Sequence, residues 1–226
     1  MIHRLLIANR GEIALRIVRA ARELGMYSIV AHSEADSDSL AVQQADESIC
    51  IGPAQATKSY LNVEAVLNAA RQSRADAVHP GYGFLSENAD FARAVKAAGM
   101  VFVGPDAAII ERMGDKSRAR QTALEAGVPV VPGSPSAIRD LEEALAVAEA
   151  IGYPLLVKAA AGGGGRGIRI AEDAEALVKQ LPMAQTEART AFGDDRVYLE
   201  RFISRARHIE VQILGDGERA VHFFER

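Results

Sequence analysis

The chain has 226 residues, 49% of them hydrophobic and 25% charged, with a formal net charge of −4. This composition is typical of a globular protein with one large or two smaller domains. No basic run is interleaved with aromatic residues, and the apolar start of the chain is too short for a signal peptide or a membrane span. We therefore expect no nucleic-acid partner, no membrane partner and a cytoplasmic location.

The single cysteine, Cys50, excludes an internal disulfide bond. It lies in the short apolar run Ser48–Ile51, which reads as a buried strand. We therefore expect a packed thiol and not a nucleophile.

The first hundred residues alternate between short apolar runs and segments with helical spacing. The helical segments are Gly11–Gly25, Asn62–Arg71, where Asn62 is the expected N-cap, and Glu87–Gly99. Alternation of this kind predicts a parallel sheet covered by helices, which binds ligands at the carboxyl ends of its strands. The loops expected there are Asn9–Gly11 and His79–Phe84. The apolar runs are Arg4–Ala8, Tyr27–His32, Ser48–Ile51, Ala75–His79 and Met100–Val103.

A small α+β unit is predicted next. A helix over Asp115–Gly127 leads into a connector rich in proline, and a capping box of Asp140 and Glu143 begins a second helix, which ends at Gly152. The remaining predicted elements are strands over Pro154–Lys158, Gly167–Ala171 and Val197–Arg201 and a helix over Ala174–Thr190.

The last residues predict a hairpin. Apolar Ile209, Val211 and Ile213 alternate with polar residues, a turn follows, and the chain returns over Arg219–Glu225. A two-stranded hairpin is marginal alone, so we expect it to belong to a larger sheet. The alternative is an edge packed on the α+β unit.

A glycine run between two predicted strands is the most informative motif. Four consecutive glycines and Gly167 leave the backbone free to wrap phosphate oxygens, and Lys158 and Arg166 supply positive charge. A strand, not a helix, follows the run, which excludes a Walker A loop and a dinucleotide fingerprint. The layout favours a flap over a nucleotide, although linkers and tight hairpins use glycines too.

Other polar residues have both a binding and a plain interpretation. Lys116 begins a helix and could meet phosphates or only solvent. The backbone after Glu200 could bind an adenine edge or simply end a strand, and His208 could line a cleft or a solvated strand face. A polar stripe on the first helix is either solvated or a contact surface; it comprises Arg16, Arg19 and Glu23.

Several segments, in this order, resemble the biotin carboxylase family. Other ATP-grasp enzymes share the glycine flap but not IANRGEIA and HPGYGFLSEN. The matching segments, which span nearly the whole chain, include Leu6–Ala14, Lys58–Asn62, His79–Asn88, Phe102–Pro105, Met113–Lys116, Gly127–Gly133, Gly152–Lys158, Gly162–Gly167, Val197–Glu200 and Arg207–Gln212.

The resemblance implies an α/β ATP-grasp fold and a ligase reaction. Residues 1–113 would form a Rossmann-like N-terminal domain, 114–130 a linking helix and connector, 131–203 the ATP lid, and 204–226 the start of a C-terminal domain. ATP would phosphorylate bicarbonate, and the resulting CO₂ would be captured by biotin. ATP, Mg²⁺ or Mn²⁺, carrier-bound biotin and bicarbonate are therefore the implied cofactors and substrates.

The resemblance also implies site residues. Lys116 and Lys158 would contact the ATP phosphates, His208 would lie in the nucleotide cleft, and Tyr82 would be near biotin. The flap would use Gly163, Gly164, Gly165 and Gly167. Backbone toward adenine would come from Glu200, Arg201, Phe202 and Ile203, although many relatives have lysine at position 201. A dimer contact would use Arg16, Arg19 and Glu23.

Family members are about twice as long as this chain, and their catalytic and metal-binding residues lie beyond residue 226. We therefore expect no catalytic or metal-binding residue here and no turnover by the chain alone. The implied partners are a biotin carboxyl carrier protein or domain, a carboxyltransferase and a second copy, in an acetyl-CoA carboxylase of fatty acid metabolism or a related enzyme. Alternatives are another ATP-grasp ligase, a non-catalytic fragment that binds nucleotide or a partner, and, least favoured, a Rossmann dehydrogenase.

Overall fold

The computed structural model describes residues 2–160 and 168–226. The chain divides into two compact units, Met1–Ala119 and Arg120–Arg226, which are described separately below. The flap glycines Gly163, Gly164, Gly165 and Gly167 lie outside the described residues.

The first unit is a three-layer α/β structure built on a parallel sheet of strand order β3-β2-β1-β4-β5. In chain order its elements are β1 (Arg4–Ile7), α1 (Gly11–Glu23), β2 (Tyr27–His32), η1 (Glu34–Asp36), α2 (Leu40–Gln44), β3 (Glu47–Cys50), η2 (Ala56–Lys58), α3 (Val63–Gln72), β4 (Ala77–His79), α4 (Ala89–Ala97), β5 (Val101–Phe102) and α5 (Ala107–Gly114).

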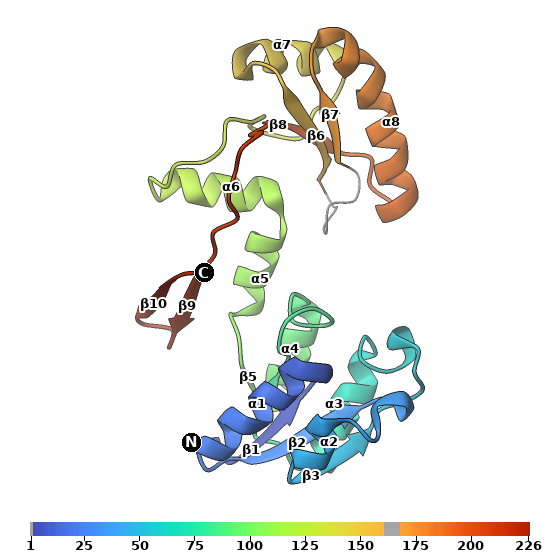
Figure 1. Cartoon of the computed structure of the whole chain (residues 1–226), viewed down its shortest axis with the longest axis vertical. Coiled ribbons are helices and arrows are strands. Elements are labelled where there is room, and N and C mark those ends of the chain that lie inside the picture. Colours follow the sequence, from blue (N-terminus) through green and yellow to red (C-terminus); the bar gives the residue numbers. More distant parts are fainter. Residues whose placement is uncertain (1, 161–167) are drawn as a thin grey trace. The chain divides into compact units, whose positions relative to one another are not determined.

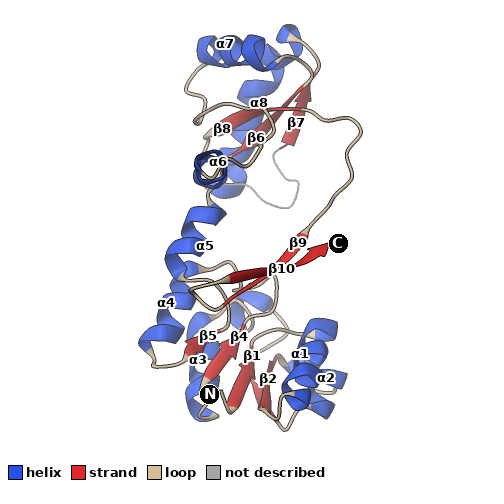
Figure 2. Cartoon of the chain, turned by 90° about the vertical axis from the view of Figure 1, so that its left-hand side faces the viewer, coloured by secondary structure: helices blue, strands red, loops and turns tan. Residues whose placement is uncertain are grey.

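Both faces of this sheet are buried, as a parallel sheet requires. On one face Leu5 and Ile7 of β1 pack against Ile17 and Val18 of α1. On the other face Leu6 packs with side chains of α3 and α4. Figure 2 shows helices on both sides of the strands. The central strands therefore read as continuous apolar runs in the sequence.

Local signals set the helix ends of this unit. The side chain of Asn62 accepts a hydrogen bond from the N–H of Ala65, so the predicted N-cap of α3 is confirmed. Asn88 caps α4 in the same way through the N–H of Phe91. Gly99 follows α4 with φ of +80°, a conformation that favours glycine.

The prediction for Cys50 is wrong. The thiol is exposed, because β3 is the edge strand of the sheet and its side chains alternate between half-buried and exposed. Four apolar or small residues in a row suggested burial on both faces, but only a central strand is covered on both.

The second unit contains an antiparallel sheet of order β7-β6-β8 and a separate two-stranded sheet (Figure 1). Its elements are β6 (Leu155–Ala159), β7 (Ile168–Ala171), α7 (Leu141–Ile151), α8 (Ala174–Phe192), β8 (Val197–Arg201), β9 (Val211–Gly215) and β10 (Ala220–Glu225). Helix α6 (Lys116–Glu125) crosses the boundary between the units.

Helices α7 and α8 cover one face of the three-stranded sheet. Leu155 and Val157 of β6 and Leu199 of β8 are fully buried there together with Leu177 of α8. The predicted cap of α7 is confirmed, since the Asp140 carboxylate accepts from the N–H of Glu143 at 2.9 Å.

The hairpin β9–β10 is exposed on both faces. It forms its own sheet, so the alternative that it is an edge of the three-stranded sheet is wrong. His208 was expected on the polar face of its first strand, but β9 begins only at Val211.

Candidate functional site

The face of the three-stranded sheet opposite α7 and α8 gathers polar and apolar side chains. We call it the open face. Pairing places Lys158 beside Tyr198, and Leu156 beside Glu200, on this face. The neighbouring strand β7 adds two isoleucines, Ile168 and Ile170, each about 40% exposed (42% and 41%). The open face is thus an apolar surface around a small polar group.

The polar group is an ion pair. The ammonium of Lys158 donates to the carboxylate of Glu200 on the adjacent strand, and both side chains are about four-fifths buried, with exposed fractions of 21% and 19%. The ammonium also lies 5.9 Å from the ring centroid of Tyr198. Burial, and then the negative charge of Glu200, raise the pKa of Tyr198 to about 12, so the phenol stays neutral. A fixed cation beside apolar side chains can bind a ligand that is anionic at one end and apolar or planar at the other.

The segment after Glu200 uses part of its backbone within its own unit. The N–H of Arg201 donates to the carbonyl of Pro132 at 2.8 Å, and the N–H of Phe202 to that of Pro154 at 2.9 Å. The guanidinium of Arg201 donates to the carbonyl of Ile151, at the end of α7, and so satisfies a helix terminus. Sequence reasoning missed this role of the arginine.

The predicted nucleotide residues are therefore only partly brought together. Lys158 and Glu200 meet directly, and Ile203 follows them with half its surface exposed (50%). His208 is exposed and lies 3.2 Å from the Glu210 carboxylate, ahead of β9. Lys116 is the first residue of α6, and its side chain lies outside the described part of the structure.

A pocket of about 380 Å³ lies in the first unit, where β1 and β4 end. These strands are neighbours, but the chain passes from β1 to β2 on one side and reaches β4 on the other, which is the switch point where such sheets bind ligands. We call it the strand-end pocket. It is lined by Asn9, Arg10, Gly11, Glu12, Ile13, Tyr82, Gly83 and Phe84.

Asn9 ties the two loops of this pocket together. Its buried side-chain amide donates to the carbonyls of Pro80 at 2.7 Å and Tyr82 at 2.8 Å. The N–H of Gly81 donates to Nδ1 of His79 at 3.0 Å, and burial lowers the pKa of this histidine. The expectation that the two loops meet at the carboxyl ends of the strands is confirmed. Tyr82 is mostly exposed, and its hydroxyl donates to the carboxylate of Glu12.

The three predicted contact residues of α1 share its exposed side. Arg16, Arg19 and Glu23 line a shallow hollow of about 400 Å³ together with Glu12 and Leu15. Arg19 also approaches the side chain of Gln44 on α2, at 3.5 Å.

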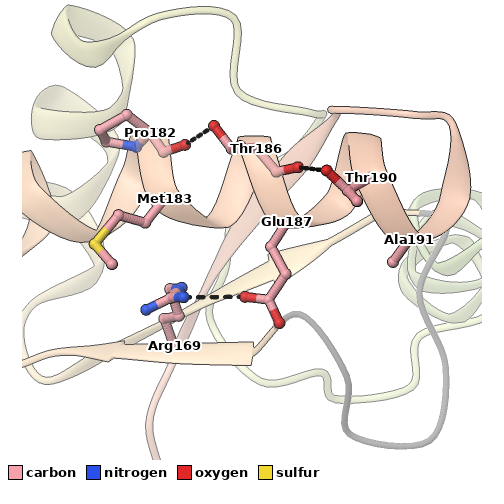
Figure 3. A pocket seen from close by; sticks show the side chains of 7 residues that line it. All are labelled: Arg169, Pro182, Met183, Thr186, Glu187, Thr190 and Ala191. Carbon is pink, nitrogen blue, oxygen red and sulfur yellow. Dashed lines mark hydrogen bonds and ion pairs between the residues drawn. The ribbon is translucent and has the colours of Figure 1, made fainter.

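A further cavity, of about 570 Å³, lies between α8 and β7 (Figure 3). Arg169 is paired there with Glu187 and Gln180. The hydroxyls of Thr186 and Thr190 donate to helix carbonyls. The cavity is on the helix side of the sheet, so it is separate from the open face.

Within residues 2–160 and 168–226, no three His, Cys, Asp or Glu side chains gather as metal ligands. In the same part of the chain, no helix is long and apolar enough to cross a membrane.

Two family models match the chain. Residues 1–110 match the biotin carboxylase N-terminal domain, and residues 115–226 match the ATP-binding domain of the carbamoyl-phosphate synthase L chain. Together they account for both compact units.

Curated relatives are similar over the whole chain or nearly all of it. Biotin carboxylase 1 of Bacillus subtilis is 52% identical over 227 residues, which is 100% of this chain and 50% of the relative. Biotin carboxylase of Pseudomonas aeruginosa is also 52% identical, over 100% of this chain and 51% of its own length. The human mitochondrial propionyl-CoA carboxylase alpha chain is 48% identical over 94% of this chain and 29% of its own. The chain spans about half the length of the bacterial relatives and corresponds to their N-terminal half.

Solved structures that resemble the chain belong to the same family as these relatives. A biotin carboxylase–beta-gamma-ATP complex from Campylobacter jejuni has a TM-score of 0.93 and 49% identity, over 98% of this chain and 50% of that one. The biotin carboxylase domain of Hydrogenobacter thermophilus 2-oxoglutarate carboxylase, with MgADP, ADP and bicarbonate, has a TM-score of 0.91 and 46% identity, over 100% and 50%. The predicted α/β ATP-grasp fold is confirmed.

Proposed function

Because the chain belongs to the biotin carboxylase family, we propose that it forms the ATP-binding half of an enzyme that carboxylates biotin with bicarbonate. The observation that carries the proposal is 52% identity to biotin carboxylases over the full length of the chain. Another ATP-grasp ligase would account for the second unit, but not for a first unit that matches the biotin carboxylase N-terminal domain.

The open face is the proposed floor of the nucleotide site. Lys158 would bind the phosphates, since its ammonium is held in place by Glu200 and lies beside apolar side chains suited to a base. The adenine edge would meet carbonyls after Glu200 or the N–H of Ile203, because the N–H groups of Arg201 and Phe202 donate within the unit. ATP, bound with Mg²⁺ or Mn²⁺, would supply the phosphoryl group that activates bicarbonate.

Other residues have proposed roles around this floor. Gly163, Gly164, Gly165 and Gly167 would close over the phosphates, as glycine backbone can. Lys116 would be a second phosphate contact, and His208 would reach the nucleotide cleft. Residues 1–113 would act as the N-terminal domain, 114–130 as the link, 131–203 as the lid and 204–226 as the beginning of a further domain.

The proposed partners follow from the same family. Biotin would arrive on a carrier protein or domain and lie near Tyr82. A carboxyltransferase would pass the carboxyl group to an acceptor such as acetyl-CoA, which would connect the protein to fatty acid metabolism, and the location would be cytoplasmic. A second copy would dock through Arg16, Arg19 and Glu23, whose side chains share the exposed side of α1.

Calorimetric titration with Mg-ATP tests the nucleotide site. A charge-assisted contact contributes about 1.5–3 kcal/mol, so Lys158→Ala is expected to weaken ATP binding about 10- to 100-fold and to leave adenosine binding nearly unchanged. Lys179→Ala is the matched control, because this lysine is exposed on α8 and pairs with Glu175 of the same helix. Equal ATP affinity of the Lys158 variant and the unchanged chain would refute the proposed role.

Turnover needs a separate assay. Bicarbonate-dependent ATP hydrolysis by the chain alone is expected to be absent, since the family's catalytic residues are expected elsewhere. The expected result is therefore that the chain binds ATP but does not hydrolyse it.

A further inference from the structure

The carboxylate of Asp36 does not line the strand-end pocket, but it binds Arg10, which does. We propose that Asp36 is a positioning residue of this pocket, which fixes Arg10 directly and Phe84 through Tyr60. The inference rests on the proposed function, in which this pocket holds biotin beside Tyr82. Asp36 ends η1, the turn that follows β2, so the carboxyl ends of β2, β1 and β4 are joined through it.

The Asp36 carboxylate accepts four hydrogen bonds from three residues. Arg10 donates from Nε to Oδ2 at 2.9 Å and from Nη2 to Oδ1 at 2.5 Å. The hydroxyls of Ser33 and Tyr60 donate to Oδ2 at 2.8 and 2.7 Å. The Asp36 side chain is only 13% exposed. A carboxylate with this many donors can hold all of them only in its ionised form.

Tyr60 connects Asp36 to the pocket, because it binds Asp36 through its hydroxyl and contacts Phe84 through its ring. Its ring is buried, and its hydroxyl is fixed from a second side by the N–H of Ser33, which donates to it at 2.8 Å. The ring stacks on Phe84, with centroids 5.1 Å apart and planes inclined by 29°. Phe84 has φ of +43°, a strained conformation that a non-glycine residue keeps only where contacts with its surroundings offset the cost. The stack supplies that support.

The loop that carries Tyr82 is therefore held at two points. Asn9 binds its beginning through the carbonyls of Pro80 and Tyr82, and the Tyr60–Phe84 stack holds its end. Arg10 comes directly after Asn9 and is held by Asp36. One carboxylate thus holds Arg10 directly and Phe84 through Tyr60, one residue in each of the two loops of the pocket, although Asp36 itself does not line it.

Amide hydrogen exchange of the full chain tests the proposal without nucleotide or biotin. The probes are the loop amides of Gly81, which donates to His79, and Ser86, which donates to the carbonyl of Gly83 at 2.9 Å. Asp36→Asn is expected to speed their exchange at least about 10-fold, as loss of charge-assisted bonds would, while the amides of β1 and β4 keep their rates.

The matched control is Asp46→Asn. The Asp46 carboxylate, too, is an acceptor, of two hydrogen bonds from the N–H and hydroxyl of Ser28 at 2.8 and 2.7 Å, but it joins β2 to the residues before β3. The substitution Asp46→Asn is expected to leave the exchange of the loop amides unchanged. Tyr60→Phe keeps the stack and loses only the hydroxyl, so it should speed loop exchange less than Asp36→Asn; it also carries the test if the Asp36 variant does not fold.

Three results would overturn the proposal: unchanged loop exchange in the Asp36 and Tyr60 variants, equal loop effects of Asp36→Asn and Asp46→Asn, or faster exchange spread evenly over the sheet. The last would mean that Asp36 supports the whole unit and does not position the loop. The ATP titration reports on the other unit, so failure of one experiment leaves the other interpretable.

Discussion

Asp36→Asn should destabilise the first unit in a pH-dependent way. The guanidinium of Arg10, together with the hydroxyls of Tyr60 and Ser33, lowers the pKa of Asp36 from 3.8 to about 2. At about 1.4 kcal/mol per unit, this shift corresponds to roughly 2 kcal/mol of stability at neutral pH. Because the Arg10 side chain is 51% exposed, solvent screening should reduce the measured value to about 1–2 kcal/mol.

The sign follows from the lowered pKa in the folded state. The stabilising contribution is fully present above the unfolded pKa near 4 and is lost as the pH falls toward 2. The difference in unfolding free energy between the wild-type chain and Asp36→Asn should thus be constant from pH 7 to 5 and fall to about half by pH 3.

Urea unfolding followed by circular dichroism at pH 7, 5, 4 and 3 measures this difference. The relevant transition is the one that the substitution shifts, because the two units can unfold separately. A difference that stays constant down to pH 3, or that grows as the pH falls, would refute the assignment of the stabilisation to an ionised Asp36.

Three further experiments have defined outcomes. Gly81→Ala should destabilise by about 2 kcal/mol or more, since φ is +64° and a Cβ would lie 2.6 Å from the side-chain nitrogen of Asn9. Gly83→Ala should cost only about 1 kcal/mol in the same denaturation assay, since φ is +68° but, among the described residues other than its chain neighbours, none has an atom within 4 Å of the added Cβ. Asp140→Ala should lower stability by about 1 kcal/mol through loss of the α7 cap, measured as a shift in Tm. A double-mutant cycle of Lys158→Met and Glu200→Gln should give a coupling of about 1–2 kcal/mol that persists in 1 M salt, because the pair is about four-fifths buried; a coupling abolished by salt would contradict that burial.

Much of the fold could be predicted because its signals are local. The strand Val197–Arg201 was predicted with its observed bounds, and the caps at Asn62 and Asp140 lie where expected. Apolar runs bounded by helical periodicity depend only on neighbouring residues, so they can be read without knowledge of the tertiary structure.

The contacts of the candidate site were harder to predict from the sequence than the fold, for a physical reason. Arg10 and Asp36 are 26 residues apart, and Asp36 and Tyr60 are 24 apart, so their contact depends on the strand order of the sheet. A signal did exist, since Asp36 lies in the loop that follows the predicted strand Tyr27–His32, at the carboxyl end of a parallel strand. Strand order also explains the error at Cys50, because a run of apolar residues does not distinguish an edge strand from a central one.

The exposed edge position of Cys50 has a practical consequence. It is the single cysteine of the chain, so a maleimide dye or nitroxide would attach at one defined place on the first unit without any substitution. One cysteine added to an exposed position of α8, such as Lys179, would complete a pair of labels. Pulsed electron resonance or energy transfer between them would report the distribution of distances between the two units, with and without nucleotide.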